Sequence, residues 1–362
     1  MQGNSIDTYN KQIDGLRCFA VFGVLVFHFI HFENMYLARL PLGQGVNLFF
    51  VISGYLITKI LLVNKEKIKE QKTTKAKALK TFYFRRTLRI FPIYYLTIFF
   101  LLIINFQNTK EVWLWLVTYT TNFWISINHH LYIGSFAHLW SLAVEEQFYL
   151  IWPFLILFTP KKYIEKIIIS IILISLVFKI AYYYYLGCST GINALTISCA
   201  DSLGFGALVA YWDLYRKPLL NKINNIRFIV LISFLPFVYF MIYPRKYDVI
   251  PLVANNFLFS VTAFFVVMKA SQVRFSLLTK FLLENKLVLH LGKISYGIYL
   301  YHFFMPDFYN QMVDLFPNIL SLGNSFKTPF LFVSSVVFAE CSWFLLEKPI
   351  MNLKNKFQYS DR

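Results

Sequence analysis

Residues 13–28 read Ile13-Asp14-Gly15-Leu16-Arg17-Cys18-Phe19-Ala20-Val21-Phe22-Gly23-Val24-Leu25-Val26-Phe27-His28. This apolar stretch predicts a membrane-spanning helix, in which an ionisable side chain is costly and requires an explanation. Arg17 and His28 are eleven residues apart, about three helical turns, so they share one face roughly 16 Å apart along the axis. The pair therefore predicts a polar stripe inside the membrane.

The rest of the chain repeats this apolar character. Of its 362 residues, 57% are hydrophobic and 20% aromatic. The apolar blocks lie at about 13–32, 44–62, 91–106, 112–127, 139–158, 167–186, 199–215, 226–243, 251–269, 287–305 and 328–346. Blocks of this length predict an all-α integral membrane protein with several spans. The four cysteines have neither disulfide-framework nor metal-type spacing.

The net charge of +17 comes mostly from Lys and Arg between the apolar blocks. This is the positive-inside pattern of membrane proteins, and it argues against nucleic-acid binding. The most basic segment, 63–90, is predicted to be a cytoplasmic loop, which also places the N-terminus in the cytoplasm. Its cations are Lys65, Lys67, Lys69, Lys72, Lys75, Lys77, Lys80, Arg85, Arg86 and Arg89.

One block is predicted not to cross the membrane. Threonine, asparagine and serine interrupt 112–127, which suits a re-entrant or interfacial helix. Without it, ten transmembrane helices remain and both termini are cytoplasmic, the C-terminal one as a short tail at 347–362. We therefore expect residues 1–362 to form a single membrane-embedded domain, without a separate soluble domain.

A second polar group lies in the block 139–158. Glu145 and Glu146 enter this helix, and Glu145 shares a face with Ser141 and His138 at i−4 and i−7. Adjacent glutamates point about 100° apart, so only one can face a common cavity. A glutamate there could exchange protons with His28 or form a salt bridge that holds helices together.

Other polar residues lie in or beside predicted spans. Asp14 could cap the first helix or pair with Arg17. His302 could be a second site histidine or part of an interfacial aromatic belt. Asp201 and Tyr296 are also placed inside the membrane. No set of these residues has convincing metal-ligand spacing, so no metal is expected.

Together these segments resemble the membrane-bound acyltransferase family 3. The resemblance covers nearly the whole chain and rests on an ordered set of motifs. They are the Arg17–His28 spacing, 45–57 (GVNLFFVISGYLI), 85–92 (RRTLRIFP), 140–149 (WSLAVEEQFY), 294–302 (ISYGIYLYH) and 347–349 (EKP). The chain departs from the family at Asn47, usually acidic, and at Cys199, usually arginine.

The resemblance implies an O-acyltransferase that moves an acyl group, commonly acetyl, from cytoplasmic acetyl-CoA to a hydroxyl of an extracytoplasmic or lipid-linked glycan. The acyl-CoA is then a substrate, and no permanently bound cofactor is expected. The expected partners are this donor, the glycan acceptor and membrane lipids, in the inner (plasma) membrane of a bacterium.

The resemblance also implies roles for individual residues. His28 is the expected catalytic base or, alternatively, a transient acyl carrier. Arg17 would orient the donor or balance charge on the thioester oxygen. Further catalytic residues are Glu145 and Glu146. The expected acyl-CoA-binding residues are Arg85, Arg86, Arg89, Ser53 and Gly54. The expected supporting or acceptor residues are Asp14, His138, Trp140, Ser141, Asp201, Tyr296 and His302.

Two other functions fit the same residues. A proton-coupled transporter or flippase of lipid-linked sugars would use His28, Glu145 and Glu146 as a proton relay. Against it, the sequence contains no evident inverted repeat, and three arginines next to a span suit a phosphorylated donor. A non-catalytic subunit of a polysaccharide assembly would tolerate leucine at Arg17 and His28.

Overall fold

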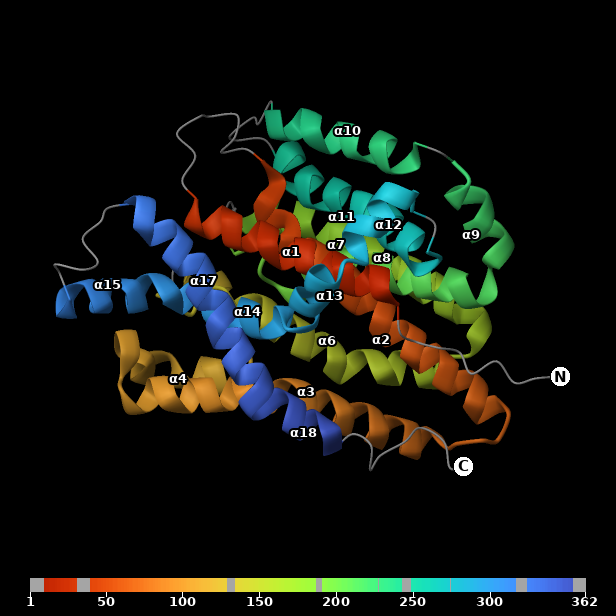
Figure 1. The fold of residues 1–362 in the computed structure, drawn as a ribbon. Coiled ribbons are helices and arrows are strands. Elements are labelled where there is room, and N and C mark those ends of the chain that lie inside the picture. Colours follow the sequence, from red (N-terminus) through yellow and green to blue (C-terminus); the bar gives the residue numbers. More distant parts are fainter. Residues whose placement is uncertain are drawn as a thin grey trace.

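A computed structural model describes residues 10–30, 40–128, 134–186, 191–226, 228–242, 249–273, 275–316 and 324–353, and these ranges contain helices and no strand (Figure 1). In chain order the helices are α1 (Lys11–Phe29), η2 (Pro41–Gln44), α2 (Gly45–Lys69), α3 (Lys75–Ile103), η3 (Phe106–Asn108), α4 (Thr109–Val117), α5 (Thr121–Asn128), α6 (Leu139–Phe158), α7 (Lys161–Leu186), α8 (Thr196–Tyr215), α9 (Lys217–Asn224), α10 (Ile229–Ile242), α11 (Val249–Ser271), α12 (Leu277–Leu283), α13 (Lys286–Lys293), α14 (Ser295–Tyr301), η4 (His302–Phe304), α15 (Met305–Leu315), α17 (Asn324–Ser342), η5 (Trp343–Glu347) and α18 (Lys348–Asn352). In Figure 1, α10 lies along one edge of the bundle and α3 with α4 along the opposite edge, with α1 and α6 between them.

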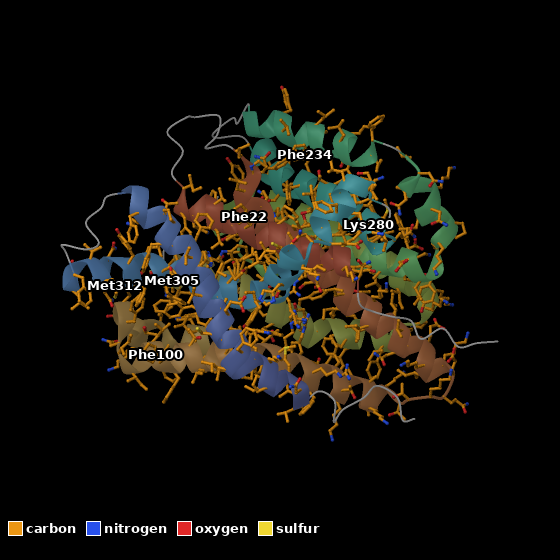
Figure 2. The ribbon with its side chains drawn as sticks, in the orientation of Figure 1. Phe22, Phe100, Phe234, Lys280, Met305 and Met312 are labelled. Atoms are coloured by element: carbon orange, nitrogen blue, oxygen red, sulfur yellow. The ribbon has the colours of Figure 1, made fainter. Side chains whose placement is uncertain are left out.

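Six helical segments of the described chain are long and apolar enough to cross a membrane. They are Lys11–Phe29, Pro41–Lys69, Lys75–Ile103, Gly134–Phe158, Val253–Ser271 and Phe326–Asn352. A seventh is added if α9 and the following helix, bent by 69°, count as one span. Large apolar side chains face outward, among them Phe22 and Phe100, which are 55% and 60% exposed (Figure 2). The outer surface is thus suited to lipid, and the predicted all-α membrane class is confirmed.

The helices do not follow every predicted block. The block 287–305 was expected to be one span, but it is divided into α13, α14 and η4. The break is at Ile294, where φ is −90° and ψ is 6°. Each piece is much shorter than the roughly 20 residues that a straight span requires.

The block 112–127 also differs from the prediction. A single re-entrant or interfacial helix was expected, but the structure has two short helices, α4 and α5. Between them Tyr119 has a φ of 53°, in the left-handed region, which interrupts the helix. Nine residues of α4 rise only about 13 Å, so neither helix alone reaches across a hydrocarbon core of about 30 Å.

The basic segment 63–90, predicted to be a cytoplasmic loop between two spans, is mostly helical. Helix α2 continues to Lys69, and α3 begins at Lys75 after a cap by the Thr74 side chain. Lys65 donates hydrogen bonds to the carbonyl oxygens of Ile156, Leu157 and Thr159 at 2.9, 3.0 and 2.6 Å. A lysine stabilises the C-terminus of α6 there, because the last carbonyls of a helix lack backbone partners.

Gly54 lies at the crossing of α2 and α8. A Cβ at Gly54 would collide with the carbonyl oxygen of Leu203, and one at Gly206 would collide with that of Val51. Small residues at a crossing allow two backbones to approach closely. Gly54 therefore faces α8, which is the alternative of tight helix packing, and its predicted contact with acyl-CoA stays a prediction.

Candidate functional site

An inner cavity of about 70 Å³ lies among α1, α2, α3, α6 and α14. It is lined by Arg17, Val46, Phe49, Phe50, Ile52, Ser53, Leu56, Arg86, Arg89, Ile90, Ser141, Leu142, Glu145, Tyr149, Ser295, Tyr296 and Tyr299. Seven residues predicted from the sequence therefore meet here, although they are up to 279 positions apart in the chain. They are Arg17, Ser53, Arg86, Arg89, Ser141, Glu145 and Tyr296.

A second cavity, which we call the vestibule, has a volume of about 440 Å³. It is lined by Asn10, Ile13, Asp14, Arg17, Leu56, Ile57, Lys59, Ile60, Arg86, Arg89, Leu289, Lys293, Tyr296, Trp343, Glu347 and Met351. On α2 it reaches Ile60, toward the basic end of the helix, whereas the inner cavity extends to Val46.

The vestibule and the inner cavity meet at a shared set of residues. These are Arg17, Leu56, Arg86, Arg89 and Tyr296. The cations around the vestibule outnumber its two carboxylates. The cations are Arg17, Lys59, Arg86, Arg89 and Lys293, and the carboxylates are Asp14 and Glu347. The vestibule is therefore suited to an anionic ligand, with a narrow extension into the bundle.

Glu145 is the glutamate that faces the inner cavity. Ser53 donates a hydrogen bond to its Oε1 at 2.6 Å, and the Ser53 and Tyr149 hydroxyls are 2.8 Å apart. The Arg86 guanidinium lies 4.1 Å from the centre of the Tyr149 ring. Glu146 lines neither cavity in the described structure, and its Oε1 is buried without a hydrogen-bond partner. The structure thus separates the two carboxylates that the sequence left equivalent.

His28 lies in a cluster of three histidines beside the inner cavity. Its ring centre is 5.3 Å from that of His302, which is 5.1 Å from that of His138. His302 donates from Nδ1 to the carbonyl of Tyr299 at 2.7 Å, and His138 donates from Nε2 to that of Leu300 at 3.0 Å, because a carbonyl can only accept. The other ring nitrogens of His138 and His302 are buried without partners. The described residues contain no group of three or more potential ligands placed to hold a metal.

Tyr299 separates this cluster from the inner cavity. Its hydroxyl is 2.6 Å from the Ser141 hydroxyl and donates to the carbonyl of His138 at 3.1 Å. Its ring centre is 5.3 Å from that of His302 and 5.7 Å from that of His138. Tyr299 lines the inner cavity and its ring contacts His302 and His138, whereas His28, among the described residues, lines neither cavity.

The predicted site set is only partly assembled around the cavities. Asp14 lines the vestibule, 3.7 Å from Arg17, as the salt-bridge alternative expected. Within the described chain, Arg85 and Trp140 line neither cavity. The sequence placed Tyr299 and Lys293 in or beside a predicted span without a site role, and it gave Tyr149 and Lys59 no site role either. A signal for Tyr299 was present, because it is three residues from both Tyr296 and His302 and shares their helical face.

Comparison with known proteins identifies the family of the chain. The sequence pattern of an acyltransferase domain, that of acyltransferase family 3, matches residues 10–345. The chain belongs to this family. It is 30% identical over 381 residues to the peptidoglycan O-acetyltransferase OatA of Listeria monocytogenes, and 28% identical over 373 residues to the O-acetyltransferase OatA of Staphylococcus aureus.

These alignments cover 96% and 94% of this acyltransferase but only 56% and 57% of the two relatives. The chain thus spans little more than half their length. No solved structure matches it. The protein is therefore a membrane acyltransferase by family and by its apolar helices.

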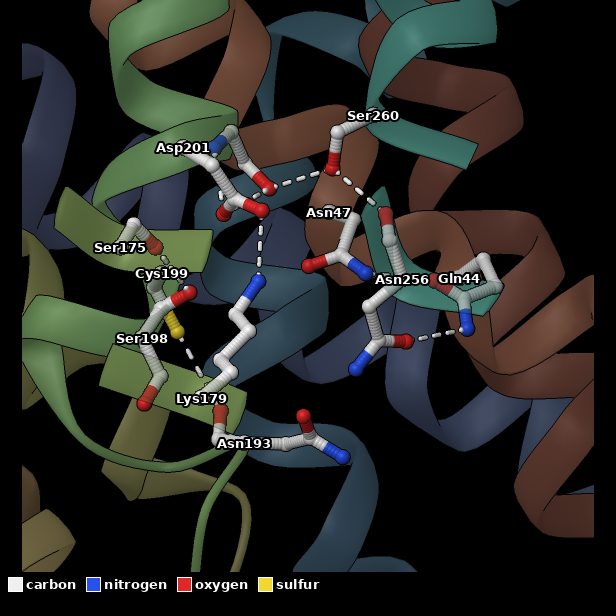
Figure 3. Close-up of polar contacts among 11 residues, drawn as sticks. Gln44, Asn47, Ser175, Lys179, Asn193, Ser198, Cys199, Asp201, Asn256 and Ser260 are labelled. Carbon is white, nitrogen blue, oxygen red and sulfur yellow. Dashed lines mark hydrogen bonds and ion pairs between the residues drawn. The ribbon is translucent and has the colours of Figure 1, made fainter. Parts of the chain in front are cut away.

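Asp201 has a place in the acyltransferase outside the cavities. It forms a 2.5 Å ion pair with Lys179, and the two side chains are 0% and 3% exposed (Figure 3). Asp201 also accepts from the backbone N–H of Ser202, whose hydroxyl is 2.6 Å from that of Ser260. The pair thus links α7 and α8, and the serines continue to α11. Asp201, predicted as a possible acceptor or supporting residue, is thus bonded within the helix bundle, and its predicted role stays a prediction.

The two departures from the family pattern are Asn47 and Cys199, and both lie near the Lys179–Asp201 ion pair (Figure 3). Asn47 donates to Gln44 at 2.5 Å, and Gln44 donates to Asn256 of α11 at 2.8 Å. The Cys199 thiol donates to the carbonyl of Asn193 at 3.2 Å. The side-chain donors of the uncharged residues Asn47 and Cys199 thus bond to neutral oxygens. The buried charges in this region belong to Lys179 and Asp201.

Replacing Lys179 by methionine should destabilise the fold by about 3–5 kcal/mol, because Asp201 would remain charged and buried without its partner. The double variant Lys179→Met/Asp201→Leu should recover most of this loss, since both desolvated charges are removed. Thermal unfolding of the purified protein in detergent measures both effects. A single variant as stable as the unchanged protein would contradict this role of the pair.

Proposed function

We propose that this acyltransferase moves an acetyl group from cytoplasmic acetyl-CoA to a hydroxyl group of an extracytoplasmic glycan, with His28 as the general base. The observation that carries the proposal is the pair of joined cavities, which extends from a cationic vestibule to within one side chain of the histidine cluster. The names of the relatives favour acetyl as the group and a glycan such as peptidoglycan as the acceptor.

The vestibule would hold the phosphates of the donor. Arg86 and Arg89 line both cavities, so they would bind phosphate oxygens close to the point where the narrow arm of the donor enters the bundle. Lys293 adds positive charge at the vestibule wall, and Lys59 beside it is paired with Asp213 at 3.0 Å. The thioester would then lie in the inner cavity beyond Arg17, with Ser53 and Glu145 on its wall.

In the transfer step, the acceptor oxygen attacks the thioester carbonyl, and His28 takes the proton of the hydroxyl group. The carbon–sulfur bond breaks and CoA leaves as a thiolate; water protonates the thiolate, and the imidazolium of His28 returns its proton to water, so that the step balances. Arg17 would stabilise negative charge that develops on the carbonyl oxygen.

The proposal includes a topology of ten crossings with both termini in the cytoplasm of a bacterium and the protein in its inner membrane. The basic segment 63–90 supports this orientation, since it adjoins the vestibule end of α2 and of α3. In this orientation the donor enters from the cytoplasm and the histidine cluster lies toward the outer face.

Comparing cell-envelope glycans by mass spectrometry, with and without the gene, tests the function. We expect glycans from cells that express the protein to carry additional acetyl groups, which mild alkali removes as expected for esters. Cells that express His28→Gln should resemble cells without the gene. Unchanged acetylation together with altered export of a lipid-linked sugar would instead support the transporter.

A further inference from the structure

We propose that the outer end of the inner cavity limits the transferred group to a short acyl chain. This end is formed by Val46, Ser141, Leu142 and Tyr299. The inference rests on the proposed function, because it assumes that the inner cavity receives the acyl arm of the donor. It adds a structural reason for selecting the acyl group.

The lining residues show which end of the inner cavity opens into the vestibule. Leu56 and Tyr296 are shared with the vestibule, whereas Val46 and Tyr299 line only the inner cavity. Leu56 and Val46 are ten residues apart on α2, a rise of about 15 Å along the helix axis. Tyr149 and Ser141 are eight residues apart on α6, a rise of about 12 Å. The inner cavity is thus a slot that leads away from the vestibule.

The slot is narrow as well as long. It contains about 70 Å³, compared with about 440 Å³ in the vestibule. A single water molecule needs about 10–15 Å³ on this measure, so the slot accommodates roughly five such molecules over its length. This is space for one extended chain of atoms, without room for a branch or a fold in that chain.

The end of the slot is held firmly in place. Ser141 and Leu142 are 3% and 6% exposed, and Tyr299 is 7% exposed. Hydrogen bonds link the Tyr299 hydroxyl to Ser141 and to the carbonyl of His138. Beside Val46, Gly45 packs so closely on α1 that a Cβ there would collide with the carbonyl of Ala20. These contacts leave little freedom for the end to retreat before a longer ligand.

A longer acyl chain would consequently place the thioester carbonyl closer to the vestibule and further from the histidine cluster. The end of the chain would meet Leu142 and Tyr299 first, and every added methylene would keep the thioester carbonyl further from the histidines. A misplacement of about 1 Å at a reacting centre can cost about 10²-fold in rate. The slot should therefore discriminate against longer acyl groups mainly in the transfer step.

The test compares acetyl-CoA with butyryl-CoA as donors for the purified protein in proteoliposomes, with an envelope glycan as the acceptor. The variant Leu142→Ala lengthens the slot. Leu150→Ala is the matched control, because Leu150 is on the same helix but is 64% exposed and outside the slot lining. We expect Leu142→Ala to raise the ratio of butyryl to acetyl transfer at least tenfold, and Leu150→Ala to leave it unchanged.

A second variant, Val46→Ala, enlarges the same end from α2 and should act in the same direction even if Leu142→Ala does not fold. The inference is overturned if both folded variants keep the ratio of the unchanged protein, or if the unchanged protein uses butyryl-CoA as rapidly as acetyl-CoA. Failure of the unchanged protein to transfer an acyl group from either donor would instead refute the proposed function and the inference with it.

Discussion

Replacing His28 by glutamine should reduce acyl transfer by about 10²- to 10⁴-fold, which is the usual contribution of a general base. Glutamine retains much of the size and polarity of the imidazole, but it cannot accept the proton of the acceptor hydroxyl. Because the described contacts of His28 are with the rings of neighbours such as His302 and Phe303, a side chain of similar size should leave the variant folded. Transfer of acetyl to the glycan by equal amounts of membrane protein is the measurement.

A matched control comes from α13. His290 is also on a helix of the bundle, but it is hydrogen-bonded to Glu340 and lies outside both cavity linings in the described structure. His290→Gln should retain most of the transfer activity. If His28→Gln retains it as well, His28 is not the base; if both variants lose it equally, the loss does not depend on the position of His28 in the histidine cluster.

Replacing Arg89 by alanine should raise the KM for acetyl-CoA by about 10- to 100-fold, since a hydrogen bond to a charged group contributes about 1.5–3 kcal/mol. Arg89 lines both cavities, so it would contact the donor where the vestibule narrows. An interaction made equally with bound donor and transition state affects KM more than kcat. Initial rates over a range of acetyl-CoA concentrations separate the two constants.

Arg85 provides the control for charge. It is on the same helix, four residues before Arg89, but it lines neither cavity in the described chain. Arg85→Ala should therefore change KM by much less than Arg89→Ala, although both variants lose one positive charge near the membrane surface. If the two variants raise KM equally, the arginines act by general electrostatic attraction of the anionic donor and Arg89 does not belong to a defined binding site.

Helical periodicity explains how much of the site was accessible from sequence. Ser141, Glu145 and Tyr149 are spaced four residues apart, which places them on one face of a helix. The sequence analysis used this spacing for Ser141 and Glu145, and it applies equally to Tyr149. The ionisable residues of α1 and α3 also pointed inward, because their burial in lipid would be costly. The polar residues that line the inner cavity were thus predictable from single helices.

Contacts between helices were not predictable in the same way. The pattern around Gly54 does not reveal that α8, rather than a ligand, faces it, and the pattern around Asp201 does not reveal Lys179 as its partner. The predicted span at 287–305 failed because its break at Ile294 involves neither glycine nor proline. Tertiary packing determines such positions, so the position of Tyr299 between cavity and histidines required a structure.

The most direct test of the central claim is a sided transfer assay in membrane vesicles. Acetyl-CoA is charged and does not cross the membrane, so labelled donor can be supplied to one face only. With inside-out vesicles, which expose the cytoplasmic face, we expect label to reach glycan acceptor enclosed in the lumen, and His28→Gln vesicles to show no such transfer. Transfer that occurs only when the donor is supplied to the opposite face would contradict the proposed route from the vestibule to the histidine cluster.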